Sequence, residues 1–173
     1  MELQTFLLGL VYIFPAYVSN AAPVVAVRFF KRLHPLDGGM LFIDGRRLLG
    51  NGKTVEGLIS GTAAGFATGS IINLLIPSLI TMTEVFLLSV GAMAGDILGA
   101  FVKRRAGLPS GSPAPLLDQL GFLLAALALV HLFKGLPSWM DSLTLLALSL
   151  FTVFMHVGTN AAAYLLKLKD RWY

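Results

Sequence analysis

Two carboxylates and three adjacent cations between residues 95 and 119 are the side chains of this sequence best suited to chemistry. Asp96 lies inside an apolar segment, Lys103, Arg104 and Arg105 close that segment, and Asp118 opens the next one. An Asp at the centre of a membrane helix costs about 2.5 to 3.5 kcal/mol on insertion scales, so such a carboxylate indicates a functional site. The simpler structural alternative for Asp96 is an ion pair with one of the neighbouring cations.

A glycine-rich stretch further upstream offers a second set of polar groups. Residues 50–54 read GNGKT, which looks like the end of a nucleotide-binding P-loop, but that motif requires a glycine at position 47, where Arg47 stands. The stretch is therefore not a P-loop. We still expect it to bind phosphate, because accessible backbone N–H groups beside Lys53 suit phosphate oxygens. Glu56 follows three residues later, either as part of a site or as a carboxylate that favours the start of a helix.

The composition indicates a membrane protein. Of 173 residues, 56% are hydrophobic and 13% are charged, whereas charged residues make up about 25% of a usual soluble domain. The 13 Lys and Arg exceed the 9 Asp and Glu, but these cations form short clusters between long apolar runs, which argues against nucleic acid as a partner. The absence of cysteine excludes a thiolate metal site.

Five apolar segments predict the fold. They run over about residues 3–30, 55–76, 84–102, 116–133 and 142–166, and a membrane-spanning helix needs roughly 20 apolar residues. We expect one all-α transmembrane domain over residues 1–173, with about five transmembrane helices and with loops at 31–54 and 103–115. Glycines recur every four residues from Gly57 to Gly69, so they share one helical face and allow a neighbouring helix to approach closely.

The positive charges predict the orientation in the membrane. Twelve of the 13 cations lie at or in the first long loop, after the third segment or at the C-terminus, and Lys134 alone lies on the other side. The positive-inside bias then places the N-terminus outside and the C-terminus in the cytoplasm. The glycine-rich loop and the stretch from Asp96 to Asp118 therefore open on the cytoplasmic side of the cell membrane.

Carboxylates beside cations and glycine-rich backbone suit a divalent metal with phosphate substrates. Mg²⁺ is commonly held by one or two carboxylates together with phosphate oxygens, and Asp96 and Asp118 are the best candidate ligands. The three histidines, at positions 34, 131 and 156, have no partner at motif spacing. A zinc site or a histidine-activated nucleophile is therefore not predicted.

Several motifs taken together support a resemblance. They are AYVSNAAPV at 16–24, DGG at 37–39, DGRRLLGNGKTVEG at 44–57, GD at 95–96 with FVKRR at 101–105, and LDQ at 117–119. In this order they strongly resemble the archaeal CDP-archaeol synthases, distant relatives of the phosphatidate cytidylyltransferases. The resemblance implies Mg²⁺-dependent transfer of CMP from CTP to the phosphate of 2,3-bis-O-geranylgeranylglycerol phosphate, which forms CDP-archaeol and pyrophosphate in archaeal phospholipid biosynthesis.

Residue roles follow as a hypothesis from the resemblance and the chemistry of the side chains. Asp96 and Asp118 would hold Mg²⁺ at the triphosphate, and Lys53 would complete the catalytic set. The lipid would reach this site sideways between the glycine-faced helices. The predicted substrate-binding residues are Asn20, Asp44, Arg46, Arg47, Thr54, Glu56, Lys103, Arg104, Arg105 and Ser110.

Other classes of protein remain as alternatives. A membrane transporter of an anionic solute would also use broken helices and an intramembrane carboxylate, although the polar groups cluster on one side and no inverted repeat is evident. A CDP-alcohol phosphotransferase would carry Ala-Arg shortly after Asp-Gly, and neither Asp37-Gly38 nor Asp44-Gly45 is followed in that way. A purely structural membrane protein would leave the carboxylates on that side unexplained.

Overall fold

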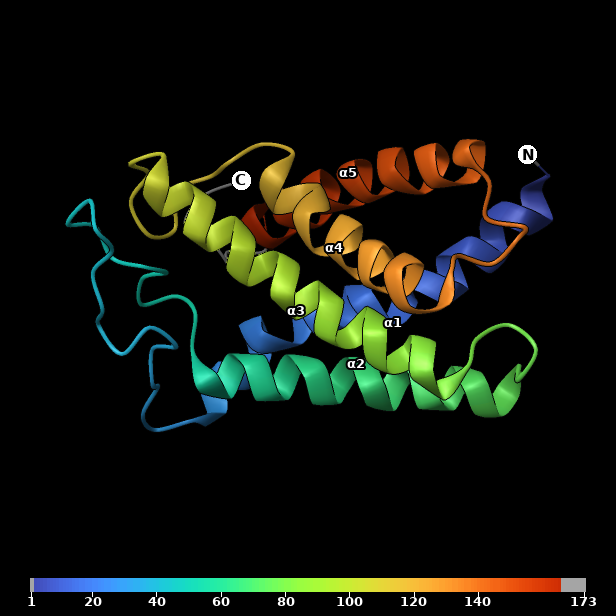
Figure 1. Cartoon of the computed structure of the whole chain (residues 1–173), viewed down its shortest axis with the longest axis horizontal. Helices are drawn as coiled ribbons and strands as arrows, with labels where there is room; N and C mark the ends of the chain where they lie inside the picture. Colours follow the sequence, from blue (N-terminus) through green and yellow to red (C-terminus); the bar gives the residue numbers. More distant parts are fainter. Residues whose placement is uncertain (1, 166–173) are drawn as a thin grey trace.

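Five long helices form the protein. The computed structural model describes residues 2–165 and shows α1 (Leu3–Ala26), α2 (Val55–Leu75), α3 (Met82–Arg105), α4 (Leu117–Lys134) and α5 (Ser142–Leu165), with a short 3₁₀ helix η1 (Val27–Phe29) directly after α1 (Figure 1). All five are long and apolar enough to cross a membrane. Within residues 2–165 there is no β-strand, only two isolated bridges. The prediction of an all-α protein with about five transmembrane helices is confirmed.

The helix boundaries differ from the predicted segments mainly at α3. This helix begins at Met82, where Thr81 and Glu84 form a reciprocal capping box. It continues through Lys103, Arg104 and Arg105, which lie in its last turn rather than in a loop. Residue 166, the predicted end of the fifth helix, and the three C-terminal cations lie outside the described residues.

The glycine face of α2 is filled by neighbouring helices. A Cβ atom on Gly65 would stand 1.8 Å from Oγ of Ser19 in α1, and one on Gly69 would stand 2.4 Å from a methyl carbon of Val85 in α3. Any larger side chain would push α1 and α3 away, so the glycines serve close helix packing. The expectation that lipid passes between the glycine-faced helices is therefore wrong, because that space is occupied by protein.

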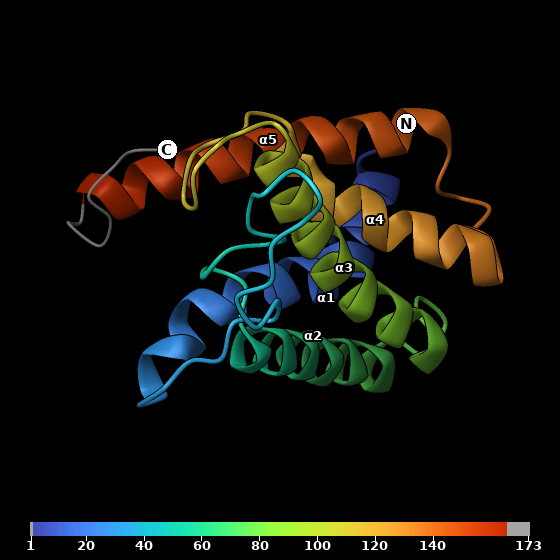
Figure 2. The same ribbon diagram turned by 60° about the vertical axis from the view of Figure 1, so that its left-hand side comes forward.

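Helix α3 lies at the centre of the bundle and packs closely on α4. Figures 1 and 2 show α3 between α2 on one side and α4 on the other, with α5 beyond α4. A Cβ atom on Gly95 would stand 2.4 Å from the carbonyl oxygen of Gly121, so the two backbones are almost in contact. The long connection from α1 to α2 and the connection from α3 to α4 meet at the same end of the bundle (Figure 1). The candidate residues other than Asn20 lie in these two connections or in the adjoining parts of α2, α3 and α4.

Candidate active site at the loop end of the bundle

Lys53 and Asp96 form the first charged pair of the site. The Nζ atom of Lys53 donates to Oδ2 of Asp96 at 2.6 Å, and the two side chains are 25% and 32% exposed. Lys53 is held here because Thr54 is the N-cap of α2, with its hydroxyl accepting from the N–H of Gly57. The partner of Asp96 therefore comes from the glycine-rich loop and not from the cations on its own helix.

Lys103 and Asp118 form the second pair. Nζ of Lys103 donates to Oδ1 of Asp118 at 2.6 Å and also to the carbonyl oxygen of Ser112, while Oδ2 of Asp118 accepts from the N–H of Ala114. Asp96 and Lys103 are seven residues apart on α3, so they lie on one helical face about 10 Å apart along the axis. The two lysine–carboxylate pairs thus follow the same face of α3.

Asp37 organises the loop that carries Lys53. Its side chain is 1% exposed and accepts hydrogen bonds from Nε and Nη2 of Arg47 and from the backbone N–H groups of Gly39, Leu49 and Gly50. The Arg47 guanidinium and these N–H groups hold the pKa of Asp37 well below its ordinary value, and the carboxylate in turn raises the pKa of Arg47. Asp37 and Arg47 are therefore the centre of the folded loop.

Two arginines tie this loop to the end of α3. Arg46 of the loop donates to the carbonyl oxygen of Arg105 at 2.9 Å, at the C-terminus of the helix. In return, Arg105 donates to Asp44 and to the carbonyl oxygen of Arg47, both at 2.6 Å. The guanidinium of Arg105 also lies 4.6 Å from the ring centre of Phe42, a cation–π contact. Loop and helix end are thus joined in both directions.

Arg104 and Ser110 lie beneath the glycines of the loop. Arg104 is 7% exposed, and its Nη2 donates to the carbonyl oxygen of Pro109 while its Nε is buried without a hydrogen-bond partner. Gly50 has a φ of +93°, and a Cβ atom on it would stand 3.3 Å from Oγ of Ser110. A glycine is required at this position by both the backbone conformation and the contact.

The predicted substrate-binding residues therefore divide into groups. The first group lies around the loop and consists of Asp44, Arg46, Arg47, Lys103, Arg104, Arg105 and Ser110. The six charged side chains of this group already have partners within the protein. Thr54 is used as a helix cap, and Glu56 accepts from the ring and the backbone N–H of His34. Asn20 lies apart from this cluster.

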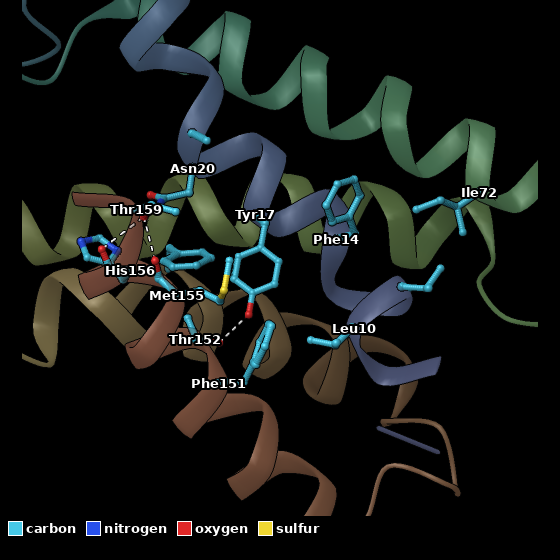
Figure 3. A pocket seen from close by; sticks show the side chains of 13 residues that line it. Leu10, Phe14, Tyr17, Asn20, Ile72, Phe151, Thr152, Met155, His156 and Thr159 are labelled. Atoms are coloured by element: carbon cyan, nitrogen blue, oxygen red, sulfur yellow. Dashed lines mark hydrogen bonds between the residues drawn. The ribbon is translucent and has the colours of Figure 1, made fainter. Parts of the chain in front are cut away.

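Asn20 lines a cavity between α1 and α5 that the sequence did not predict. The cavity has a volume of about 680 Å³ and a mainly apolar lining that includes Leu10, Phe14 and Phe151. Figure 3 shows Asn20 near His156 and Thr159 at one end of the cavity, while Tyr17 and Thr152 share a hydrogen bond deeper inside. The spacing of positions 10, 14, 17 and 21 on α1 could have indicated this face, since these residues lie on one side of a helix.

The donors at this end fit a metal that arrives with a phosphate ligand. Within residues 2–165 no three Asp, Glu, His or Cys side chains are close enough to form a metal cage. Two carboxylates are present instead, Asp96 and Asp118, each 32% exposed and each opposite a lysine. Mg²⁺ is usually bound in this way, by one or two carboxylates and by substrate phosphates, with waters completing its shell.

The fold is shared with a solved intramembrane enzyme. Over 87% of this chain and 91% of the other, the structure matches an intramembrane enzyme for the biosynthesis of archaeal membrane lipids, with a TM-score of 0.78 and 40% sequence identity. The five apolar helices and the charged end of the bundle therefore define a multi-pass membrane protein of the intramembrane-enzyme class.

The sequence comparisons give the family. The model of the CarS-like family, described as CDP-archaeol synthase, matches residues 2–173. The CDP-archaeol synthase of Pyrobaculum calidifontis is 48% identical, with 96% of this chain and 94% of the relative covered. That of Methanocaldococcus jannaschii is 42% identical, with 94% of each chain covered. The chain belongs to the CDP-archaeol synthase family of cytidylyltransferases, as the sequence resemblance indicated, and acts on CTP and a lipid phosphate in a membrane.

Proposed function

We propose that this protein transfers CMP from CTP to the phosphate of 2,3-bis-O-geranylgeranylglycerol phosphate in a Mg²⁺-dependent reaction at the cytoplasmic face of the cell membrane. The lipid phosphate oxygen forms a bond to the α-phosphorus of CTP, the bond from that phosphorus to the β-phosphate breaks, and pyrophosphate leaves. CDP-archaeol is the product. The observation that carries this proposal is the arrangement of the Lys53–Asp96 and Lys103–Asp118 pairs on one face of α3.

The two pairs supply what the reaction requires. The attacking phosphate is already anionic, so no side chain has to remove a proton from it; the difficulty is bringing two anions together. Lys53 and Lys103 carry the positive charge that binds phosphate oxygens, and each is oriented by a carboxylate at 2.6 Å. Asp96 and Asp118 would hold Mg²⁺, which would supply further positive charge against the triphosphate.

The cavity between α1 and α5 suits the lipid chains. Its lining is mainly apolar, and its polar end at Asn20 lies toward the C-terminal end of α1, where the loop begins. An isoprenoid chain could occupy this volume while the phosphate remains at the polar end. The cavity replaces the glycine-faced helices as the proposed route of the lipid, and Asn20 keeps its proposed role as a substrate contact there.

The proposal is tested by CMP transfer from labelled CTP with purified protein, Mg²⁺ and the isoprenoid lipid phosphate. Asp96→Asn and Asp118→Asn should each lower kcat by at least about a hundredfold, because the charge that binds the metal is lost. Asp141→Asn is the matched control. Asp141 lies at the opposite end of the bundle and caps α5 through the N–H of Thr144, and Asn serves equally well as a cap. Near-normal Mg²⁺-dependent rates in both site variants would exclude the assignment of the site.

The same assay separates enzyme from transporter. A transporter would move an anionic solute into sealed vesicles without consuming CTP, whereas the proposed enzyme releases one pyrophosphate for each CDP-lipid formed. Testing other nucleoside triphosphates and acyl lipid phosphates in parallel would define the nucleotide and the lipid.

A further inference from the structure

The cations of the protein differ sharply in whether they have partners. Among the ten Lys and Arg residues within residues 2–165, the six at the loop and at the end of α3 all contact groups of the protein. Four cations in this part of the chain are exposed and have no side-chain partner. Lys134 lies at the other end of the bundle, and Arg28, Lys31 and Arg32 lie together just after α1.

The segment around these three cations also exposes large apolar side chains. Phe29 is 83% exposed, Phe30 is 46% exposed and Leu33 is 44% exposed. Figure 2 shows the end of α1 beside the start of α2 and away from α4 and α5. Phenylalanine and leucine side chains beside unpaired cations are typical of segments that lie at a membrane surface, with the apolar groups toward the acyl chains and the cations toward the headgroups.

The length of α1 puts this segment at the required depth. Its 24 residues measure about 36 Å, and the hydrocarbon core of a bilayer is about 30 Å thick. The residues that follow Ala26 therefore emerge in the headgroup layer. The cavity between α1 and α5 is lined on α1 by residues up to Asn20 and Ala21, five residues before the helix ends at Ala26. The basic segment therefore follows the polar end of the cavity closely along the chain.

We infer that Arg28, Lys31 and Arg32, with Phe29 and Phe30, form a docking surface for the anionic headgroup of the lipid phosphate substrate, before the lipid moves to the reaction site. This inference rests on the proposed function and adds the place at which the lipid is captured. A nucleotide is disfavoured as the occupant because it has no chains to cover the exposed phenylalanine rings. The surface raises the local concentration of the anionic lipid at the cavity and takes no part in the bond-making step.

The kinetic test compares the two substrates. The triple variant R28Q/K31Q/R32Q is placed in phosphatidylcholine liposomes, and the mole fraction of lipid phosphate is varied at saturating CTP. The KM for the lipid should rise at least about fivefold, given the strength of single Lys or Arg contacts with anionic headgroups, while kcat and the KM for CTP stay unchanged. The variant R28K/R32K keeps all three charges and should retain the normal KM, as should K134Q, which removes the unpaired cation at the other end.

A second measurement does not depend on catalysis. Spin-labelled phosphatidic acid in phosphatidylcholine vesicles reports, by its motionally restricted fraction, how strongly the protein retains an anionic lipid. The triple variant should lower that fraction relative to the wild type and K134Q, and added salt should reduce it in the wild type and K134Q but not in the triple variant. If no CMP transfer occurs in the wild type, the proposed function fails, and the spin-label result still tests the surface.

Two results would overturn the inference. An unchanged KM for the lipid together with unchanged spin-label retention would show that the cations do not bind the headgroup. A raised KM for CTP with a normal KM for the lipid would show that the surface serves the nucleotide instead.

Discussion

Replacing the buried carboxylate of Asp37 with an amide should open the glycine-rich loop without unfolding the helices. Asp37 accepts five hydrogen bonds, two of them from Arg47. Removing one partner of a buried ion pair costs about 3 to 5 kcal/mol. The lower end applies to Asp37→Asn, since the Arg47 side chain is 31% exposed and can be partly rehydrated. About 3 kcal/mol corresponds to roughly a hundredfold change in the equilibrium between closed and open loop.

Hydrogen exchange followed by mass spectrometry measures this change directly. In Asp37→Asn, the amides of residues 38–50 should exchange about a hundredfold faster, whereas amides in the middle of α3 keep their protection. Asp44→Asn is the matched control, because Asp44 lies in the same loop but is 35% exposed, and the expected cost of losing an exposed pair is about 1 kcal/mol or less. Activity should also fall in Asp37→Asn, because Lys53 is no longer held near Asp96.

The pH dependence gives an independent check. The pKa of Asp37 is lowered in the folded loop, so its contribution to stability is complete above the ordinary pKa of about 3.9 and is lost only as the pH falls through the lower, folded value. Loop protection in the wild type, corrected for intrinsic exchange, should therefore stay constant from about pH 7 to pH 5. Equal exchange rates in Asp37→Asn and the wild type would refute the role given to this carboxylate.

Three further predictions concern helix packing, capping and the first charged pair. Gly65→Ala should lower the melting temperature in detergent, because its Cβ would stand 1.8 Å from a serine oxygen of α1, whereas Gly99→Ala, whose nearest contact is 3.7 Å, should not. Thr54→Ala should destabilise the start of α2 by about 1 kcal/mol, seen as faster amide exchange there, and Thr54→Ser should restore it. Lys53→Met should raise the affinity of the nucleotide-free protein for Mn²⁺ by about fivefold, since Asp96 loses the cation that competes with the metal. Electron paramagnetic resonance measures this affinity. An unchanged affinity would show that Lys53 does not compete with a metal for Asp96.

The helices and their packing were largely predictable from the sequence. Apolar segments of about 20 residues and the four-residue glycine spacing follow from periodicity and helix geometry, which are local properties. The exact ends of α3 were less accessible, because Arg104 and Arg105 look like loop residues until their contacts with Pro109 and Asp44 are known.

The partners of the charged side chains could not be read from the sequence. Lys53 and Asp96 are 43 positions apart, and nothing in their spacing selects this pair over the cations that follow Asp96 on the same helix. In the sequence Asp37 is only the first residue of the DGG motif at 37–39, and the folded loop shows that it is the central acceptor. The cavity between α1 and α5 also required the structure, because it depends on how two helices distant in sequence cross.

The reciprocal contacts of Arg46 and Arg105 affect how members of this family can be recombined. Each arginine donates to backbone carbonyl oxygens of the other segment, so the register of the loop on the helix depends on both main chains. A hybrid protein that takes residues 37–53 from one relative and α3 from another would combine a loop and a helix end whose backbone contacts come from different proteins. Exchanging residues 37–53 together with 101–112 should yield active hybrids more often than exchanging either segment alone.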